Sequence, residues 1–174
     1  MELVGSGSRA RFYNNLDLKT YTRISQIRRA FDFLCHAGVH VEQWLPKAAL
    51  SGRQFDLRLV TIAGQVQHAV VRTSKSPITN LHLGNRRGDL AELQSRLGRG
   101  GWKHIERITA QAAAQFPSSH CLGVDLLLEP GLRRPTILEV NAFGDLLPGV
   151  VHDGLSTYEA QVANLLALLR RDCR

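Results

Sequence analysis

A β-hairpin with isolated acidic side chains is the most constraining feature of the sequence. Residues 120–129 and 135–142 are apolar, β-prone runs joined by the turn residues of PGLRRP. Asp125 lies among leucine and valine in the first run, and Glu139 and Asn141 interrupt the second. If the hairpin is centred on Leu132, Asp125 stands directly opposite Glu139. Asn141 then shares their side of the sheet, because side chains alternate along a strand.

These three side chains predict a cation site. Carboxylates at the roughly 4.5–5.5 Å Cβ spacing of direct cross-strand neighbours repel each other and need a proton or a cation between them. Two carboxylates and an amide carbonyl suit a hard cation, Mg²⁺ or Mn²⁺. The alternative is that Asp125 and Glu139 end their strands in solvent, or pair with Arg133 and Arg134. The apolar neighbours on both strands favour the cation site.

The remaining elements alternate between hairpins and helices. Helices are predicted over residues 23–36, 89–97 and 103–116, and from Ser156 onward, where Ser156 and Glu159 form a capping box. Further strands are predicted over residues 39–45, 55–62 and 65–73. The last two flank a tight AGQ turn, and residues 74–88 read as a loop. This order indicates an α+β fold with an antiparallel sheet flanked by helices.

Apolar stripes on three helices predict which helix faces are buried. The predicted buried positions are Ile24, Ile27, Phe31 and Leu34; Ile105, Ile108, Ala112 and Phe116; and Tyr158, Val162, Leu165 and Leu169.

Composition narrows the class of protein. The 174 residues fit one domain, and 44% hydrophobic with 21% charged residues is ordinary for a globular protein. No apolar run reaches a membrane span, and the first residues lack the pattern of a secretory signal. The three cysteines are scattered and form no CxxC pair, so reduced thiols in the cytoplasm are the simplest interpretation.

The formal net charge of +7 favours an anionic partner such as a nucleotide, a nucleic acid or an acidic peptide. The basic residues are spread along the chain and are not interleaved with aromatic residues. A basic nucleic-acid-binding protein therefore remains a disfavoured alternative.

The stretch GVDLLLEP…PTILEVNAFGD resembles the metal-binding end of the ATP-grasp ligases, in the branch of the RimK-type glutamate ligases and glutathione synthetases. That family places an Asp and then Glu-x-Asn on neighbouring strands to hold two Mg²⁺ ions against the phosphates of ATP. The resemblance implies that Asp125, Glu139 and Asn141 hold metal. It extends, in the same order, over nearly all of residues 4–170.

Four other segments support the resemblance and imply nucleotide-binding roles. VGSGSR resembles the Gly-rich phosphate loop, VEQWLP the hinge strand that reads adenine, the 55–72 hairpin the D-x-R hairpin, and ITNLHLGN the later nucleotide loop. The implied nucleotide-binding residues are Gly5, Ser6, Gly7, Ser8, Gln43, Trp44, Leu45, Asp56 and Asn80. Asp56 and Arg58 share a strand face, and Arg72 returns near Asp56 on the next strand. Arg58 and Arg72 are implied to neutralise the phosphate or the acyl phosphate.

The resemblance implies a partial ATP-grasp domain, without the N-terminal domain and most of the small lobe. Residues 1–50 would be the end of the small lobe and the hinge, and residues 51–174 the C-terminal lobe. The implied function is an ATP- and Mg²⁺-dependent carboxylate–amine ligase acting through an acyl phosphate on unidentified carboxylate and amine substrates. An upstream half or a second subunit would complete it. A non-catalytic or split-subunit ATP-binding module is the alternative, and no membrane partner is expected.

Overall fold

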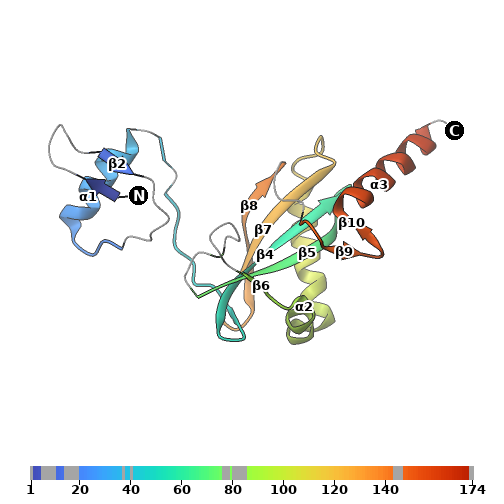
Figure 1. Ribbon diagram of the computed structural model, residues 1–174, viewed down its shortest axis with the longest axis horizontal. Coiled ribbons are helices and arrows are strands. Elements are labelled where there is room, and N and C mark those ends of the chain that lie inside the picture. The colour runs from blue at the N-terminus through green and yellow to red at the C-terminus, as the bar shows by residue number, and fades with distance from the viewer. Residues whose placement is uncertain are drawn as a thin grey trace. The chain divides into compact units, whose positions relative to one another are not determined.

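The computed structural model describes residues 2–4, 11–13, 20–36, 38–39, 41–75, 79, 86–142 and 147–172 (Figure 1). The chain divides into two compact units, Met1–Trp44 and Leu45–Arg174. The boundary predicted from the sequence, between residues 50 and 51, lies a few residues later.

The first unit contains one small sheet and one helix. Strands β1 (Glu2–Val4) and β2 (Arg11–Tyr13) pair antiparallel, and α1 (Ile24–Cys35) confirms the predicted helix over residues 23–36. The predicted burial of its apolar stripe is wrong. No residue of α1 is buried, and the exposed fraction of Ile24 reaches 71%, because no described element of this unit packs over that face.

The strand predicted over residues 39–45 is also wrong. The described residues between 38 and 48 form no strand, and Val41 is exposed. An apolar, β-prone stretch becomes a strand only where a neighbouring strand accepts its backbone hydrogen bonds.

The second unit is built around a six-stranded sheet in which every neighbouring pair is antiparallel. Its strands are β3 (Ala49–Leu50), β4 (Arg53–Ile62), β5 (Gln65–Ser74), β6 (Arg86–Arg87), β7 (Cys121–Glu129) and β8 (Arg133–Asn141). The order across the sheet is β6-β5-β4-β7-β8, and β3 pairs with β4. With α2 (Leu90–Ala113) and α3 (Thr157–Asp172), these strands confirm the predicted α+β class with an antiparallel sheet.

Alternation along the strands gives the sheet two different faces. One face is apolar and packs against α2 through the main core, which includes Phe55, Leu57 and Leu59 of β4 and Leu93 and Ile105 of α2. Phe116, predicted to face this core, lies beyond the end of α2 and is exposed.

The opposite face is divided between apolar and charged side chains. At one end Val60, Ile62 and Val70 form a second, smaller core with Leu147 and with Ala160 of α3. At the other end the same alternation places Asp56 and Arg58 on this face.

The last helix begins where the sequence predicts and buries a different side. Ser156 and Glu159 form the predicted capping box: the backbone N–H of Glu159 donates to Ser156 Oγ, and that of Ser156 donates to Glu159 Oε2. A short antiparallel pair, β9 (Val151–His152) and β10 (Leu155–Ser156), leads into the helix. The predicted apolar stripe is exposed, because α3 runs beyond the end of the sheet (Figure 1); Leu165 is 45% exposed and Leu169 61%.

The predicted break between two helices appears as a kink inside α2. Gly98 has φ 66° and ψ 170°, and helix continues on both sides of it.

Replacing Gly98 with alanine should lower the free energy of unfolding by about 1–2 kcal/mol, because a Cβ makes positive φ costly. Gly100 lies in the same helix, and a Cβ added there would meet nothing within 4 Å. Gly100→Ala should therefore raise stability by roughly 0.5–1 kcal/mol. Urea unfolding of both variants checks the pair, and equal shifts would contradict the kink.

Candidate functional site

The β7–β8 hairpin confirms the predicted pairing of Asp125 with Glu139. The turn itself is not where the prediction placed it. The pair nearest the turn is Glu129 with Arg133, whose midpoint is Gly131, one residue before the predicted centre. Two register irregularities between that pair and Asp125 shift the alignment. Asp125 and Glu139 therefore face each other because the strands contain bulges, and both side chains lie on the same sheet face.

Five charged side chains meet on the sheet face opposite α2, and we call them the charged cluster: Lys47, Asp56, Arg58, Arg72 and Asp125. Their side chains are only 4–13% exposed. Arg72 links the two acids, with Nε 2.7 Å from Asp56 Oδ1 and Nη2 3.0 Å from Asp125 Oδ2. Arg58 Nε lies 2.9 Å from Asp125 Oδ1.

The order of strands explains why these residues converge. Strand β4 lies between β5 and β7, so its alternate residues meet a partner on each side. Asp56 is aligned with Arg72 of β5, as the sequence predicts, and Arg58 is aligned with Asp125 of β7. Opposite charges thus stand directly across from each other at two consecutive positions on this face of β4.

Lys47 is a member of the cluster that sequence reasoning missed. The backbone N–H of Ala48 donates to Leu128 O, and Ala48 O accepts from the N–H of Phe55, which fixes the chain between β7 and β4. Lys47 Nζ consequently lies 2.9 Å from Asp56 Oδ2 and 2.7 Å from Thr79 Oγ1. Its sequence signal is weak, because a single lysine after a proline has no spacing that marks it.

Two buried atoms of the cluster lack hydrogen-bond partners among the described residues. Arg58 Nη1 has none, and Asp125 Oδ1 meets Arg58 at ion-pair distance without hydrogen-bond alignment. The cluster holds three cations and two carboxylates. It therefore has one excess positive charge, one open donor that suits an anion and one open acceptor that suits a cation or a donor.

Burial and ion pairing shift the two buried acids in opposite directions. Burial alone raises a carboxyl pKa, but Arg72, Lys47 and Thr79 together hold the pKa of Asp56 below its ordinary value. Burial raises the pKa of Asp125 above its ordinary value, in spite of Arg72 and Arg58. The difference follows from the partners, since Asp56 has more donors around it.

The lowered pKa of Asp56 predicts acid sensitivity. Its ionised form is stabilised in the folded state, so that stabilisation is present above the unfolded value of about 3.9 and is lost as the pH falls below it. The melting temperature of the wild type should fall below about pH 4. The Asp56→Asn variant should show a smaller change over the same range. Parallel pH profiles of the two proteins would contradict this assignment.

Gly123 leaves the space that the Arg58 guanidinium occupies. A Cβ built on Gly123 would lie 2.7 Å from Arg58 Nη1. Gly123→Ala should therefore displace the guanidinium from Asp125 and lower the free energy of unfolding by about 1–3 kcal/mol. Thermal unfolding measures this, with the open Gly100→Ala as the control. A melting temperature equal to that of the wild type would show that Arg58 adapts without loss.

The predicted metal ligands Asp125, Glu139 and Asn141 lie on one face of neighbouring strands. Asn141 is two residues beyond Glu139 and is aligned with Gly123. Glu139 is exposed and Asn141 half-buried. Among the described residues no group of three or more His, Cys, Asp or Glu side chains is arranged for a metal. The candidate set supplies only oxygen ligands, from two carboxylates and an amide, and these are the ligands that a hard cation prefers. Asp125 Oδ1 has no hydrogen-bond partner among the described residues.

The other predicted nucleotide-binding residues stay predictions. Gly5, Ser6, Gly7, Ser8 and Asn80 lie outside the described residues. Gln43 and Trp44 belong to the first unit and are exposed, and Leu45, the first residue of the second unit, is half-buried.

Comparison with known proteins finds similarity among solved structures. No family model matches the chain, and no curated protein matches it. Among solved structures, the chain is similar to the C-terminal domain of Pby1 from K. lactis, described as an ATP-grasp enzyme interacting with the mRNA decapping enzyme Dcp2. The identity is 18% and the TM-score 0.44. The match covers 83% of this chain and 50% of that one, so this chain spans about half the length of the solved chain.

Fold and site together define an α+β protein whose antiparallel sheet carries a buried charged cluster with excess positive charge on one face. Within the described part of the chain, no helix has both the length and the apolar character needed to cross a membrane.

Proposed function

We propose that the charged cluster is the nucleotide-phosphate and metal site of an ATP-grasp carboxylate–amine ligase, in the RimK-type and glutathione synthetase branch. One observation carries the proposal: Arg58 Nη1 is a buried guanidinium donor without a hydrogen-bond partner among the described residues, and Asp125 Oδ1, 2.9 Å from Arg58 Nε, has no aligned hydrogen bond. A phosphate would accept from the first, and its bound cation would share the second with Arg58. The order of sequence motifs that resemble this family supports the same interpretation.

The arginine side chains of the cluster are held in fixed orientations that suit an anionic ligand. Arg72 is held by Asp56 and Asp125, and Asp56 is held by Lys47 and Thr79. This fixed network orients the guanidinium groups before a ligand arrives, so little conformational entropy is lost on binding. Arg58 and Arg72 would stabilise the charge that develops on a transferred phosphoryl group.

Asp125, Glu139 and Asn141 would hold the cation, Mg²⁺ or Mn²⁺. When bound, this ion neutralises phosphate charge and holds the phosphates in place. The two lone-pair positions of each carboxylate oxygen allow Asp125 to contact both an arginine and a cation. Glu139 is the member of the set that is free to turn toward it, because it makes no ion pair with a described residue.

The proposed reaction transfers the γ-phosphoryl group of ATP to a substrate carboxylate. An amine then attacks the resulting acyl phosphate, and inorganic phosphate leaves. The protein residues contribute positioning and charge stabilisation rather than covalent chemistry. A module that binds ATP without turnover is the second possibility for the same site.

Calorimetric titration with ATP, with and without Mg²⁺, tests the proposal. Binding that requires Mg²⁺ and is absent for adenosine is expected, because the cluster is proposed to bind phosphates. ADP formation in the presence of mixed amino-acid acceptors then separates a ligase from a binding module. If the chain binds duplex or single-stranded nucleic acid and not Mg–ATP, the proposal is wrong and the basic-protein alternative takes its place.

A further inference from the structure

A cavity of about 230 Å³ lies where three segments of the second unit meet. They are the turn between β3 and β4, the end of β5, and the connection from β6 into α2. Ser51 and Gly52 both have positive φ, which is typical of a tight two-residue hairpin turn. Gly88 packs closely on β5, because a Cβ added to it would lie 2.6 Å from Thr73 Cγ2. Close backbone packing therefore fixes the walls of this cavity.

Strand pairing brings two arginines to the cavity from different segments. Arg53 of β4 is aligned with the buried Leu50 of β3, and Arg86 of β6 is aligned with the buried Thr73 of β5. Aligned residues share a sheet face. Leu50 belongs to the core that packs against α2, and Thr73 is aligned with Phe55 of the same core. Both arginines therefore lie on the α2 side of the sheet, and both line the cavity.

Neither of these two guanidinium groups has a partner within the described part of the chain. No carboxylate of that part lies within 4 Å of Arg53 or Arg86, and neither side chain donates a hydrogen bond there. Arg53 Nε is in addition buried. A third arginine of the lining, Arg87, is engaged, since its Nη2 donates to Pro148 O at 2.8 Å. A buried charged donor without an acceptor costs free energy, which an acceptor in the cavity would restore.

The two carboxylates that line the cavity are engaged with other groups. Asp89 is the N-cap of α2, and its Oδ1 accepts from the backbone N–H of Glu92 at 3.0 Å. Glu92 Oε2 accepts from Ser51 Oγ at 3.0 Å, and Oε1 lies 3.9 Å from Arg96 Nη1. These contacts hold both acids away from Arg53 and leave its guanidinium for a ligand.

Charge and size together indicate the class of ligand. The lining holds three arginines and two carboxylates, so it has one excess positive charge. Its volume of about 230 Å³ exceeds the roughly 150 Å³ in which a benzene ring fits, so a phosphate group can enter. Two guanidinium groups without partners match the charge of a phosphate dianion, which arginine binds through several parallel hydrogen bonds.

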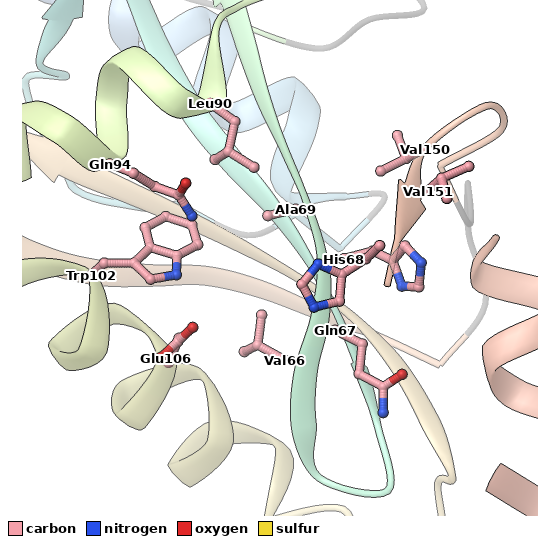
Figure 2. A pocket seen from close by; sticks show the side chains of 11 residues that line it. Val66, Gln67, His68, Ala69, Leu90, Gln94, Trp102, Glu106, Val150 and Val151 are labelled. Carbon is pink, nitrogen blue, oxygen red and sulfur yellow. The ribbon is translucent and has the colours of Figure 1, made fainter. Parts of the chain in front are cut away.

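A second cavity, of about 100 Å³, gives the contrast. It lies beside Trp102 of α2 (Figure 2), and its lining includes Glu106 and neither lysine nor arginine. His68 also lines it, and its Nε2 lies 2.9 Å from Leu155 O. The charge of this cavity does not suit an anion, so the Trp102 indole N–H is an internal control in the experiment below.

We propose that the arginine-lined cavity binds a small phosphate-bearing anion, either inorganic phosphate or a phosphate monoester. Arg53 and Arg86 donate to the phosphate oxygens, and Arg53 Nε gains the acceptor that it lacks. The site lies on the α2 side of the sheet, whereas the charged cluster lies on the opposite face. It does not depend on the function proposed for that cluster.

The probe is inorganic phosphate, titrated into the ¹⁵N-labelled full chain at constant ionic strength and followed by NMR. The backbone amides of Ser51 and Gly88 should shift with a dissociation constant on the order of 1 mM. The Trp102 indole N–H and the Asp125 amide should not shift. Methyl phosphate distinguishes the two sources of the ligand: similar affinity means that the cavity admits an ester, and binding of inorganic phosphate alone restricts it to the free ion.

Three variants complete the test. Arg53→Gln and Arg86→Gln should each weaken phosphate binding about tenfold, because each removes one donor group of the site. Arg99→Gln removes the same charge from an exposed position of α2 outside the cavity, and it should change the affinity less than about twofold at constant salt. Arg86 is exposed, so its variant tests the site even if Arg53→Gln does not fold. The proposal is overturned by shifts centred on Asp125, by wild-type affinity in Arg86→Gln, or by no saturation at about 10 mM phosphate.

Discussion

Replacing Asp56 with alanine is expected to lower the free energy of unfolding by about 3–5 kcal/mol. Asp56 is only 3% exposed and neutralises both Arg72 and Lys47. Its removal leaves two buried cations without their nearest carboxylate and takes a hydrogen-bond partner from Thr79. A buried charge that loses its partner costs far more than an exposed ion pair contributes.

Thermal and urea unfolding measure this loss. For a chain of this size the melting temperature should fall by about 6–20 °C, at about 2–4 °C per kcal/mol. Asp153→Asn is the matched control, because it removes an exposed carboxylate whose one ion pair among the described residues is with His152 at 3.5 Å, and asparagine, like aspartate, tolerates the φ of 49° at this position. The control should stay within about 0.5 kcal/mol of the wild type. If both variants melt alike, the cluster does not stabilise the fold.

Replacing Glu139 with alanine should give the opposite pattern: a large loss of ligand binding without loss of stability. Glu139 is exposed and has no ion pair with a described residue, so its removal leaves no buried charge behind. The proposed cation loses one of two carboxylate ligands, and Mg²⁺-dependent ATP binding should weaken by about tenfold or more. The melting temperature without ligand should remain that of the wild type.

The comparison with Asp125 sharpens this prediction. Asp125→Ala should lose both binding and stability, because it leaves Arg58 without a carboxylate and Arg72 with one fewer. Glu129→Ala, on the same hairpin, is the control for Glu139→Ala, since Glu129 forms an ion pair only with the exposed Arg134 among the residues that the structure describes. A Glu139→Ala protein that still binds Mg–ATP with wild-type affinity would place the cation on other residues.

Sequence alone predicted the parts of the site that depend on alternation within one hairpin. Asp56 and Arg72 face each other on β4 and β5, which are joined by a two-residue turn at Ala63 and Gly64. A register shift between Val60 and Thr61 moves the partner of Asp56 by one residue, from Val71 to Arg72. The capping box of α3 is equally local, since its two residues are three apart. Short-range patterns of this kind carry enough information to place side chains relative to one another.

The pairing of Asp125 with Glu139 was predicted correctly through a turn that was placed one residue late. The bulges that restore the alignment are not visible in the spacing of residues along either strand. The predicted burial of apolar stripes on α1 and α3 was wrong for a related reason. A stripe at positions such as Leu165 and Leu169 shows that a helix can bury one side, but the extent of the sheet decides whether anything covers it.

What the sequence by itself determined is the four long strands β4, β5, β7 and β8, the positions of the helices, the α+β class and the two carboxylate-bearing hairpins. What only the tertiary structure decided is that β7 pairs with β4, which brings Asp125 onto Arg58 and Arg72 and turns two separate hairpins into one charged cluster. The same packing brings Lys47 to Asp56 from outside either hairpin. The physical reason is that alternation fixes which face a side chain takes, while strand order depends on long-range burial that no local spacing records.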